Sequence, residues 1–401
     1  MIHPAGALLD SLTDEQGPPV HAKPEGVSRV IAGPGTGKTR VLTARIARMV
    51  LDGIDPSEIR ALVFTRSAAA QIRARLRTVI GERAYDVEVL TFHAYAWRLI
   101  QQERAEEGLR PVSVATVTEE EAFRDSIHDG PLRLPARRRV PKDRFDAAIG
   151  SRDAGSCCDV EADPAIGVLL SRFDGAGLIP TWDLLPTADA MLRDEHRVQH
   201  VLVDEAQDLT PREWSMVSRM WERSLFIVGD PHQAIMGWRG AAGFGCAPDG
   251  ATYRIRQSFR FGPDIAEMAN RIIPEAEVVG VERERHTEPF RPRAVLCRTW
   301  FECDLFETVE GETGHAWAPF RSGKRGSNVR DENANDEPNY SSASMATPIL
   351  TIHSAKGCEW DYVHIPRLPD DLEGEERRVA FVAVTRGRLA VTIGQRGGSW
   401  T

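Results

Sequence analysis

The sequence predicts an α/β protein whose two lobes, each built on a parallel β-sheet, enclose a cleft. Short apolar runs followed by turn residues and helical stretches recur in both halves of the chain, as is typical of parallel sheets covered by helices. A glycine-rich loop follows the first run, and two adjacent acidic residues end a later one. A length of 401 residues accommodates roughly two to four domains.

The apolar runs give the expected strands in chain order. In the first lobe these are residues 30–31, 61–65, 87–92, 201–203 and 225–228. In the second lobe they are residues 294–297, 349–352, 362–365 and 389–393. Because helical stretches separate the strands in each series, we expect two sheets that share one cleft.

The intervals between the strands set the expected domain limits. Residues 102–197 lack a strand signal, and their charged, alanine-containing stretches broken by Pro and Gly predict a mostly helical insertion. The first lobe is then residues 1–101 and 198–250, and the second lobe is residues 251–401. Within the second lobe, residues 311–348 are rich in Gly, Ser, Asn and Asp, which predicts a flexible linker.

Bulk composition excludes several classes of protein. The chain has 42% hydrophobic and 27% charged residues, as ordinary globular proteins do, and no apolar run approaches the roughly 18 residues that span a bilayer. The amino terminus lacks the pattern of a secretory signal, so we expect a cytoplasmic protein (host cytoplasm if phage-encoded) with no membrane role. The six cysteines lack metal-ligand spacing, which argues against a zinc site and a disulfide framework. With a net charge of -9, any nucleic-acid contact must be a local groove.

Residues 32–39 form the glycine-rich loop, Ala-Gly-Pro-Gly-Thr-Gly-Lys-Thr. An apolar run precedes it and a helical pattern follows, which favours a P-loop for ATP over a glycine turn before an ordinary helix. Backbone N–H groups can surround the phosphates, Lys38 supplies a positive charge, and the Thr39 hydroxyl can ligate Mg²⁺. Ala32 stands where the strict pattern has Gly, at a position with little phosphate contact. The other candidates in the loop are Gly33, Gly35, Thr36 and Gly37.

A second motif, residues 200–208, consists of apolar strand residues that end in Asp204 and Glu205. At the carboxyl end of a strand beside the P-loop, Asp204 would hold Mg²⁺, and Glu205 would orient and deprotonate the attacking water. A strand that ends in acids is common by itself. Together with the P-loop, however, it makes ATP hydrolysis the leading hypothesis.

The order of the motifs along the chain resembles that of the UvrD/Rep/PcrA helicases of superfamily 1. The resemblance implies two RecA-like P-loop NTPase lobes, plus the helical insertion in the first lobe, that use ATP and Mg²⁺ to move along single-stranded DNA from 3′ to 5′. The segments that carry it, besides the P-loop and the acidic pair, are residues 12–16, 62–70, 91–93, 228–241, 257–260, 351–361 and 375–387.

The resemblance also implies roles at the nucleotide. Gln16 would read the adenine edge, and Phe259 and Arg40 would stack on the two faces of the base. Phe259 stands where the family generally has Tyr. The remaining roles are those of Gln233 as γ-phosphate sensor, Arg260 and Arg386 as arginine fingers, and Glu359 at the sugar.

At the DNA, the resemblance implies that both lobes grip a single strand. Trp238 would stack on a base, which tolerates any sequence; the alternative is a core tryptophan. Arg66 and Ser67 stand where the family usually has Asn-Lys, and Cys358 and Trp360 replace Leu and Phe. The full set of expected contacts is Phe64, Thr65, Phe92, His93, Trp238, Arg239, His353 and Ser354.

The sequence leaves two segments without an assigned role and three other functions to consider. The large second-lobe insertion of the family is missing or reduced here, and six basic residues between 133 and 144 form either a duplex-binding patch or a solvated face. The expected partners are single-stranded DNA and single-strand/duplex junctions, with replication or repair proteins unspecified. Alternatives to a helicase are an ATPase that remodels nucleoprotein without unwinding, a silent DNA-binding module and a small-molecule kinase.

Overall fold

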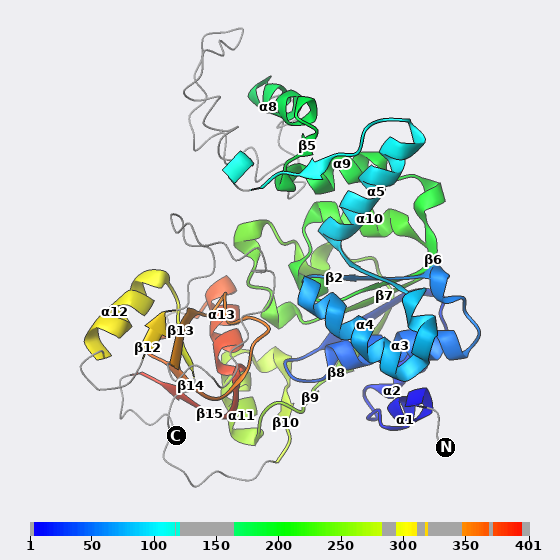
Figure 1. Ribbon diagram of the computed structural model, residues 1–401. Helices are drawn as coiled ribbons and strands as arrows, with labels where there is room; N and C mark the ends of the chain where they lie inside the picture. Colours follow the sequence, from blue (N-terminus) through cyan, green and yellow to red (C-terminus); the bar gives the residue numbers. More distant parts are fainter. Residues whose placement is uncertain are drawn as a thin grey trace.

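The computed structural model describes residues 4–116, 118–120, 164–282, 294–310, 317–319, 347–368 and 372–394. In these ranges the chain forms two large parallel sheets, with helices packed against them (Figure 1). This confirms the predicted α/β class with two lobes. No helix in the ranges just given is long and apolar enough to cross a membrane.

The first sheet has six strands in the order β3-β2-β6-β7-β1-β8, and every neighbouring pair is parallel. The strands are β1 (Gly26–Ala32), β2 (Ile59–Val63), β3 (Glu88–Thr91), β6 (Val198–Val203), β7 (Trp221–Gly229) and β8 (Ala251–Ile255). The first five contain or overlap the predicted runs. The expected boundary at residue 250 is wrong, because β8 pairs with β1 and extends the first lobe to Ile255. As a half-exposed edge strand of mixed composition, β8 gave no apolar run.

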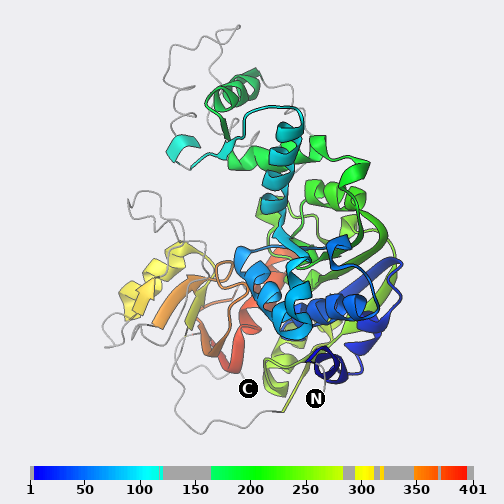
Figure 2. The ribbon, with the colours of Figure 1, turned by 45° about the vertical axis from the view of Figure 1, so that its right-hand side comes forward.

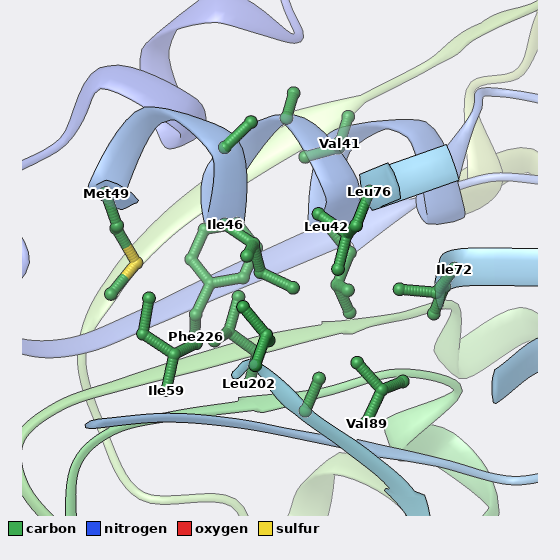
Figure 3. Packing of buried hydrophobic residues seen from close by; sticks show 14 of the residues in the cluster. Val41, Leu42, Ile46, Met49, Ile59, Ile72, Leu76, Val89, Leu202 and Phe226 are labelled. Carbon is green, nitrogen blue, oxygen red and sulfur yellow. The ribbon is translucent and has the colours of Figure 1, made fainter. Parts of the chain in front are cut away.

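Helices cover both faces of this sheet. One face carries α1 (Pro4–Asp10), α2 (Gly17–His21), α3 (Lys38–Leu51) and α4 (Arg66–Ile80), and the other carries α5 (Phe92–Glu106), α9 (Leu184–Met191) and α10 (Pro211–Met220). Leu42 and Ile46 of α3 pack on Phe226 and Leu202 of the sheet (Figure 3). The side chains of Thr65 and Thr91 accept hydrogen bonds from the first turns of α4 and α5, so these helices begin directly after their strands.

The insertion rises from the first lobe along α5 (Figures 1 and 2). Its described parts contain α8 (Pro164–Gly175), α9 and a short parallel pair, β4 (Ser113–Val114) with β5 (Leu178–Ile179). The prediction of a segment without strands therefore missed this small sheet. The basic residues 133–144 lie outside the described residues.

The second sheet has the order β12-β13-β11-β14-β15, again fully parallel. Its strands are β11 (Ala294–Cys297), β12 (Trp317–Pro319), β13 (Thr347–Thr351), β14 (Trp360–Ile365) and β15 (Gly387–Ile393). Helices α11 (Pro263–Ile272) and α13 (Gly374–Val384) share its main core, and α12 (Trp300–Glu310) packs with a second cluster. Because β12 is a strand, the segment 311–348 is not a linker throughout; most of it lies outside the described residues.

A short crossing segment joins the lobes. After β8 the chain forms β9 (Gln257–Ser258), which pairs in parallel with β10 (Val279–Gly280). Between them, α11 packs into the core of the second lobe. The predicted motif at residues 257–260 thus lies at the junction of the two lobes.

Candidate functional site

A cavity of about 690 Å³ opens between the two lobes. From the first lobe, the P-loop, the acidic motif and the segment after β7 line the cavity. From the second lobe, the crossing segment and the motifs at residues 351–361 and 375–387 line it. The predicted residues in the lining are Gly35, Gly37, Lys38, Thr39, Arg40, Glu205, Gln233, Arg260, Glu359 and Arg386. Predicted site residues that lie as far apart in the sequence as Gly35 and Arg386 therefore line the same cavity.

The P-loop connects the end of β1 to the start of α3. Gly35 and Gly37 have φ angles of 74° and 86°, a region that favours glycine. A Cβ atom on Gly35 would lie 2.4 Å from the Cβ of Arg260, so the loop also needs glycine to approach the second lobe's finger. The Lys38 ammonium rests 3.4 Å from the carbonyl oxygens of Ala32 and Gly33. These long hydrogen bonds leave the Lys38 charge available to a phosphate.

The acidic pair ends β6. The backbone N–H of Asp204 donates to Leu62 of β2, and Glu205 has a left-handed φ of 49° that turns the chain out of the sheet. Burial raises the pKa of Asp204 to about 7, and the negative charge of Glu205 adds to the shift. Burial raises the pKa of Glu205, but the charges of Lys38, Lys356 and Arg386 and the hydrogen bond from Gln207 together hold it below its usual value.

The donor set fits Mg²⁺. Asp204 is 3% exposed, and burial together with the charge of Glu205 raises its pKa, so a bound cation would stabilise its ionised form. The Thr39 hydroxyl lies at the first turn of α3 and belongs to a residue that lines the cavity. Carboxylate and hydroxyl oxygens are the ligands that this small cation prefers.

A chain of hydrogen bonds runs from Glu205 to the second lobe. Gln207 donates to Glu205 at 2.6 Å and accepts from the backbone N–H of Asp230 at 2.9 Å. The Asp230 carboxylate accepts from Gln233 at 2.7 Å, and the Gln233 side-chain oxygen accepts from Arg386 at 3.1 Å. The predicted base and the predicted finger are thereby connected through the predicted sensor. Gln207 was not among the predicted residues, although it lies two positions after Glu205.

The two predicted arginine fingers are held differently. Arg386 is 2% exposed and donates to the carbonyl of Val382 as well as to Gln233. Burial lowers the pKa of Arg386 to about 9, and the charge of Arg260 adds to this, so Arg386 keeps its proton near neutral pH. Arg260 instead donates to Glu359 at 2.6 Å and to the carbonyl of Thr385 at 3.1 Å, both in the second lobe.

One cation of the site was missed by the sequence-based prediction. Lys356 donates to both carboxylate oxygens of Asp208 at 2.6 Å and to the carbonyl of Gln233 at 2.8 Å. The Lys356 side chain is 10% exposed and that of Asp208 is 1% exposed, so a buried ion pair joins the lobes. Both residues belong to motifs that were recognised, but nothing in their spacing indicated that they would pair.

Several predicted residues lie near the cavity without lining it, namely Gln16, Gly33, Thr36, Asp204 and Phe259. Gln16 is 1% exposed, and its amide donates to the carbonyl of Thr36 at 2.8 Å. Phe259 is 42% exposed, and its backbone N–H donates to Gly35. Arg40 donates to the carbonyl of Ser11. The cavity also reaches residues of α4 that were not predicted: Gln71, Arg75, Thr78 and Val79.

Most predicted DNA contacts of the first lobe cluster together. The Arg239 guanidinium lies 4.9 Å from the centre of the Phe64 ring. Burial, with the charges of Arg239 and Arg66, lowers the pKa of His93 to about 4, so this ring is neutral at pH 7. Trp238 is 74% exposed, which excludes the alternative of a core tryptophan.

Other predicted contacts are engaged within the protein. Phe92 is 3% exposed and packs in the core under α5, so the expected DNA contact from its side chain is wrong. As the first residue of α5, it points back to the sheet. Thr65 caps α4. In the second lobe, the Ser354 hydroxyl lies 2.9 Å from that of Thr351, and burial lowers the pKa of His353.

The fold and this cavity define a two-lobed P-loop NTPase. A family model described as the UvrD/REP helicase N-terminal domain matches residues 12–148 and 176–245, and one described as the UvrD-like helicase C-terminal domain matches residues 330–395. The chain belongs to the UvrD/REP helicase family.

Curated relatives agree with this assignment. The chain is 30% identical over 298 residues to the ATP-dependent DNA helicase PcrA of Leuconostoc citreum, covering 66% of the chain and 39% of that relative. It is 30% identical over 309 residues to UvrD2 of Mycobacterium tuberculosis H37Rv (67% and 44%) and over 294 residues to DNA helicase II of Escherichia coli K12 (66% and 41%). The chain therefore matches less than half of the length of these relatives.

Proposed function

We propose that this protein is an ATP-dependent DNA helicase that moves along single-stranded DNA from 3′ to 5′ and hydrolyses ATP between its two lobes. The observation that carries the proposal is the hydrogen-bonded chain from Glu205 through Gln233 to Arg386. It joins the groups for water activation, phosphate sensing and charge neutralisation across one cavity.

The chemistry follows from the positions of the charges. Glu205, kept ionised by Lys38 and Lys356, orients the attacking water and accepts its proton. Lys38, Arg260 and Arg386 neutralise the charge that develops on the transferring phosphoryl group. Thr39 and Asp204 would hold Mg²⁺, which would supply further positive charge to the reaction.

Movement depends on the division of these groups between the lobes. The fingers belong to the second lobe, so hydrolysis requires the lobes to be closed on the nucleotide. Gln233 and Trp238 lie five residues apart in one segment, which couples the phosphate sensor to a base-stacking ring. Opening one base-pair step costs about 1.4 kcal/mol, so successive unwinding steps need this coupling to ATP.

The first experiment is ATP hydrolysis by the purified chain with and without single-stranded DNA, with Lys38→Ala as the blank. Strong stimulation by DNA that is lost in the variant supports a DNA-coupled motor. Hydrolysis that ignores DNA contradicts the proposal and favours a kinase or a nucleotide-dependent switch.

Strand separation is tested next, on duplexes that carry either a 3′ or a 5′ single-stranded tail. Displacement only from the 3′-tailed duplex supports the proposed direction. DNA-stimulated hydrolysis without displacement from either substrate favours a translocase that remodels nucleoprotein.

A further inference from the structure

We infer that Trp97 is a further base-stacking residue for the single strand, one helical turn beyond His93 and next to the insertion. The inference rests on the proposed function, because it extends the expected contacts of the first lobe, Phe64, His93, Trp238 and Arg239. These four residues are called the single-strand track below. Trp97 would accept any base, since stacking uses the face of the base and not its edge.

Trp97 is exposed where its neighbours on the same helix are buried. Tyr95 and Leu99 of α5 are 4% and 3% exposed and belong to the hydrophobic cluster under the helix, whereas Trp97 is 43% exposed. The core of the first lobe therefore covers the Trp97 ring only in part. A stacked base would remove the exposed part of this ring from water.

The helix places Trp97 about one turn beyond His93 of the track. Residues four apart lie on the same face of an α-helix, so Trp97 follows His93 on one side of α5. Four residues advance the helix by about 6 Å, between one and two times the spacing of about 3.4 Å between stacked bases. A strand that passes His93 along this face reaches Trp97 with its next bases.

The same face of α5 continues into the insertion. Arg104, seven residues beyond Trp97, donates to the carbonyl of Arg110 at 2.8 Å and forms an ion pair with Asp174 of α8 at 3.4 Å. In α5, which runs from the first lobe towards the insertion (Figures 1 and 2), Trp97 lies between His93 and Arg104. A strand leaving the first lobe towards the insertion would pass over this ring.

The charges near the start of this path suit a strand with a negative backbone. Arg66 and Arg239 both act on His93, and burial with these charges keeps that ring neutral. The cations can attract phosphates while the rings of His93 and Trp97 receive bases. The combination of cations and successive aromatic rings is the usual design of a surface that binds single strands.

The test measures binding of fluorescein-labelled oligothymidylate by the full chain, comparing Trp97→Leu and Trp97→Phe with the wild type. We expect about a five- to thirtyfold weaker affinity for Trp97→Leu and a near wild-type affinity for Trp97→Phe, which keeps a stacking ring. ATP hydrolysis without DNA and the thermal midpoint should be unchanged in both variants, which shows that they fold.

Contact is tested directly by photo-crosslinking with 5-iodouracil placed at successive positions of the oligonucleotide. We expect one of these nucleotides to crosslink to a peptide that contains Trp97. That nucleotide should lie close, along the oligonucleotide, to those that crosslink to residues of the single-strand track. The control for the binding measurement is Tyr85→Ala, which removes an aromatic side chain that is 72% exposed. Tyr85 lies before the start of β3, whereas α5, which carries Trp97, begins directly after the end of β3. The affinity of Tyr85→Ala should equal that of the wild type.

The outcomes separate this inference from the proposed function. If the wild type binds the oligonucleotide and Trp238→Ala weakens it, but Trp97→Leu binds normally and residue 97 does not crosslink, the Trp97 inference is overturned and the helicase proposal stands. If the wild type does not bind single strands at all, both are overturned.

Discussion

The two lobes hold the charged groups of the cavity in different ways. The first lobe fixes its acids locally: Asp204 and Glu205 end a central strand and are bonded to their own lobe through Leu62 and Gln207. The second lobe supplies cations that reach across, with Lys356 bonded to Asp208 and Arg386 to Gln233. The acids are therefore positioned by the first lobe itself, while the cations Lys356 and Arg386 reach this side of the cavity only because the second lobe is docked against it.

The largest expected effect comes from removing a cation that crosses the interface. Arg386→Ala should lower the kcat of ATP hydrolysis by about 10³-fold or more, because an arginine finger stabilises the charge on the transferring phosphoryl group. The measurement is steady-state hydrolysis with saturating DNA. The control is Arg271→Ala, since the Arg271 side chain is 60% exposed and pairs with Glu267 in its own helix. A kcat within tenfold of the wild type for Arg386→Ala would show that Arg386 does not act as an arginine finger.

The buried ion pair gives the next effect, on stability. Lys356→Met and Asp208→Asn should each lower the free energy of unfolding by about 3–5 kcal/mol, since each leaves one buried partner unpaired, and the double variant should lose less than the sum. Urea unfolding followed by circular dichroism measures this. The exposed pair Arg271 and Glu267 should couple by under about 0.5 kcal/mol. Additive losses at Lys356 and Asp208 would mean that the two side chains do not stabilise the protein as a pair.

The close approach of the P-loop to the second lobe is tested by paired glycine substitutions. Gly35→Ala places a Cβ against Arg260, whereas Gly53→Ala meets nothing within 4 Å; both positions have a positive φ. Gly53→Ala should cost about 1 kcal/mol for the backbone alone. Gly35→Ala should cost more and also weaken binding of a fluorescent ATP analogue. Equal costs with unchanged nucleotide affinity would argue against a tight junction at Arg260.

The smallest effect concerns pH and lies in the first lobe. Because burial lowers the pKa of His93 to about 4, the unfolded chain binds more protons than the folded chain between about pH 6.5 and 4. The stabilising difference is therefore fully present above pH 6.5 and is lost as the pH falls towards 4. His93→Gln should lose less stability than the wild type across this window, as thermal melting at pH 7 and pH 5 can show. Parallel losses in both proteins would mean that His93 titrates normally.

Local spacing in the sequence was sufficient to predict the fold class and several candidate site residues of this protein. A P-loop, an acidic strand end and the strand runs each depend on neighbours within a few residues, so Lys38, Thr39, Asp204 and Glu205 could be predicted as site residues from the chain alone. The α/β class with two lobes followed from the same alternation, because strands and helices have different periods of apolar residues.

Only the tertiary structure decided which groups meet. The pairing of Lys356 with Asp208 joins residues 148 positions apart, and the bond from Gln207 to Asp230 depends on two neighbouring strands. Burial also separated similar aromatic residues, since Phe92 faces the core and Trp97 faces water on one helix. The physical reason is that packing between distant segments sets contact, exposure and pKa, and sequence spacing does not carry this information.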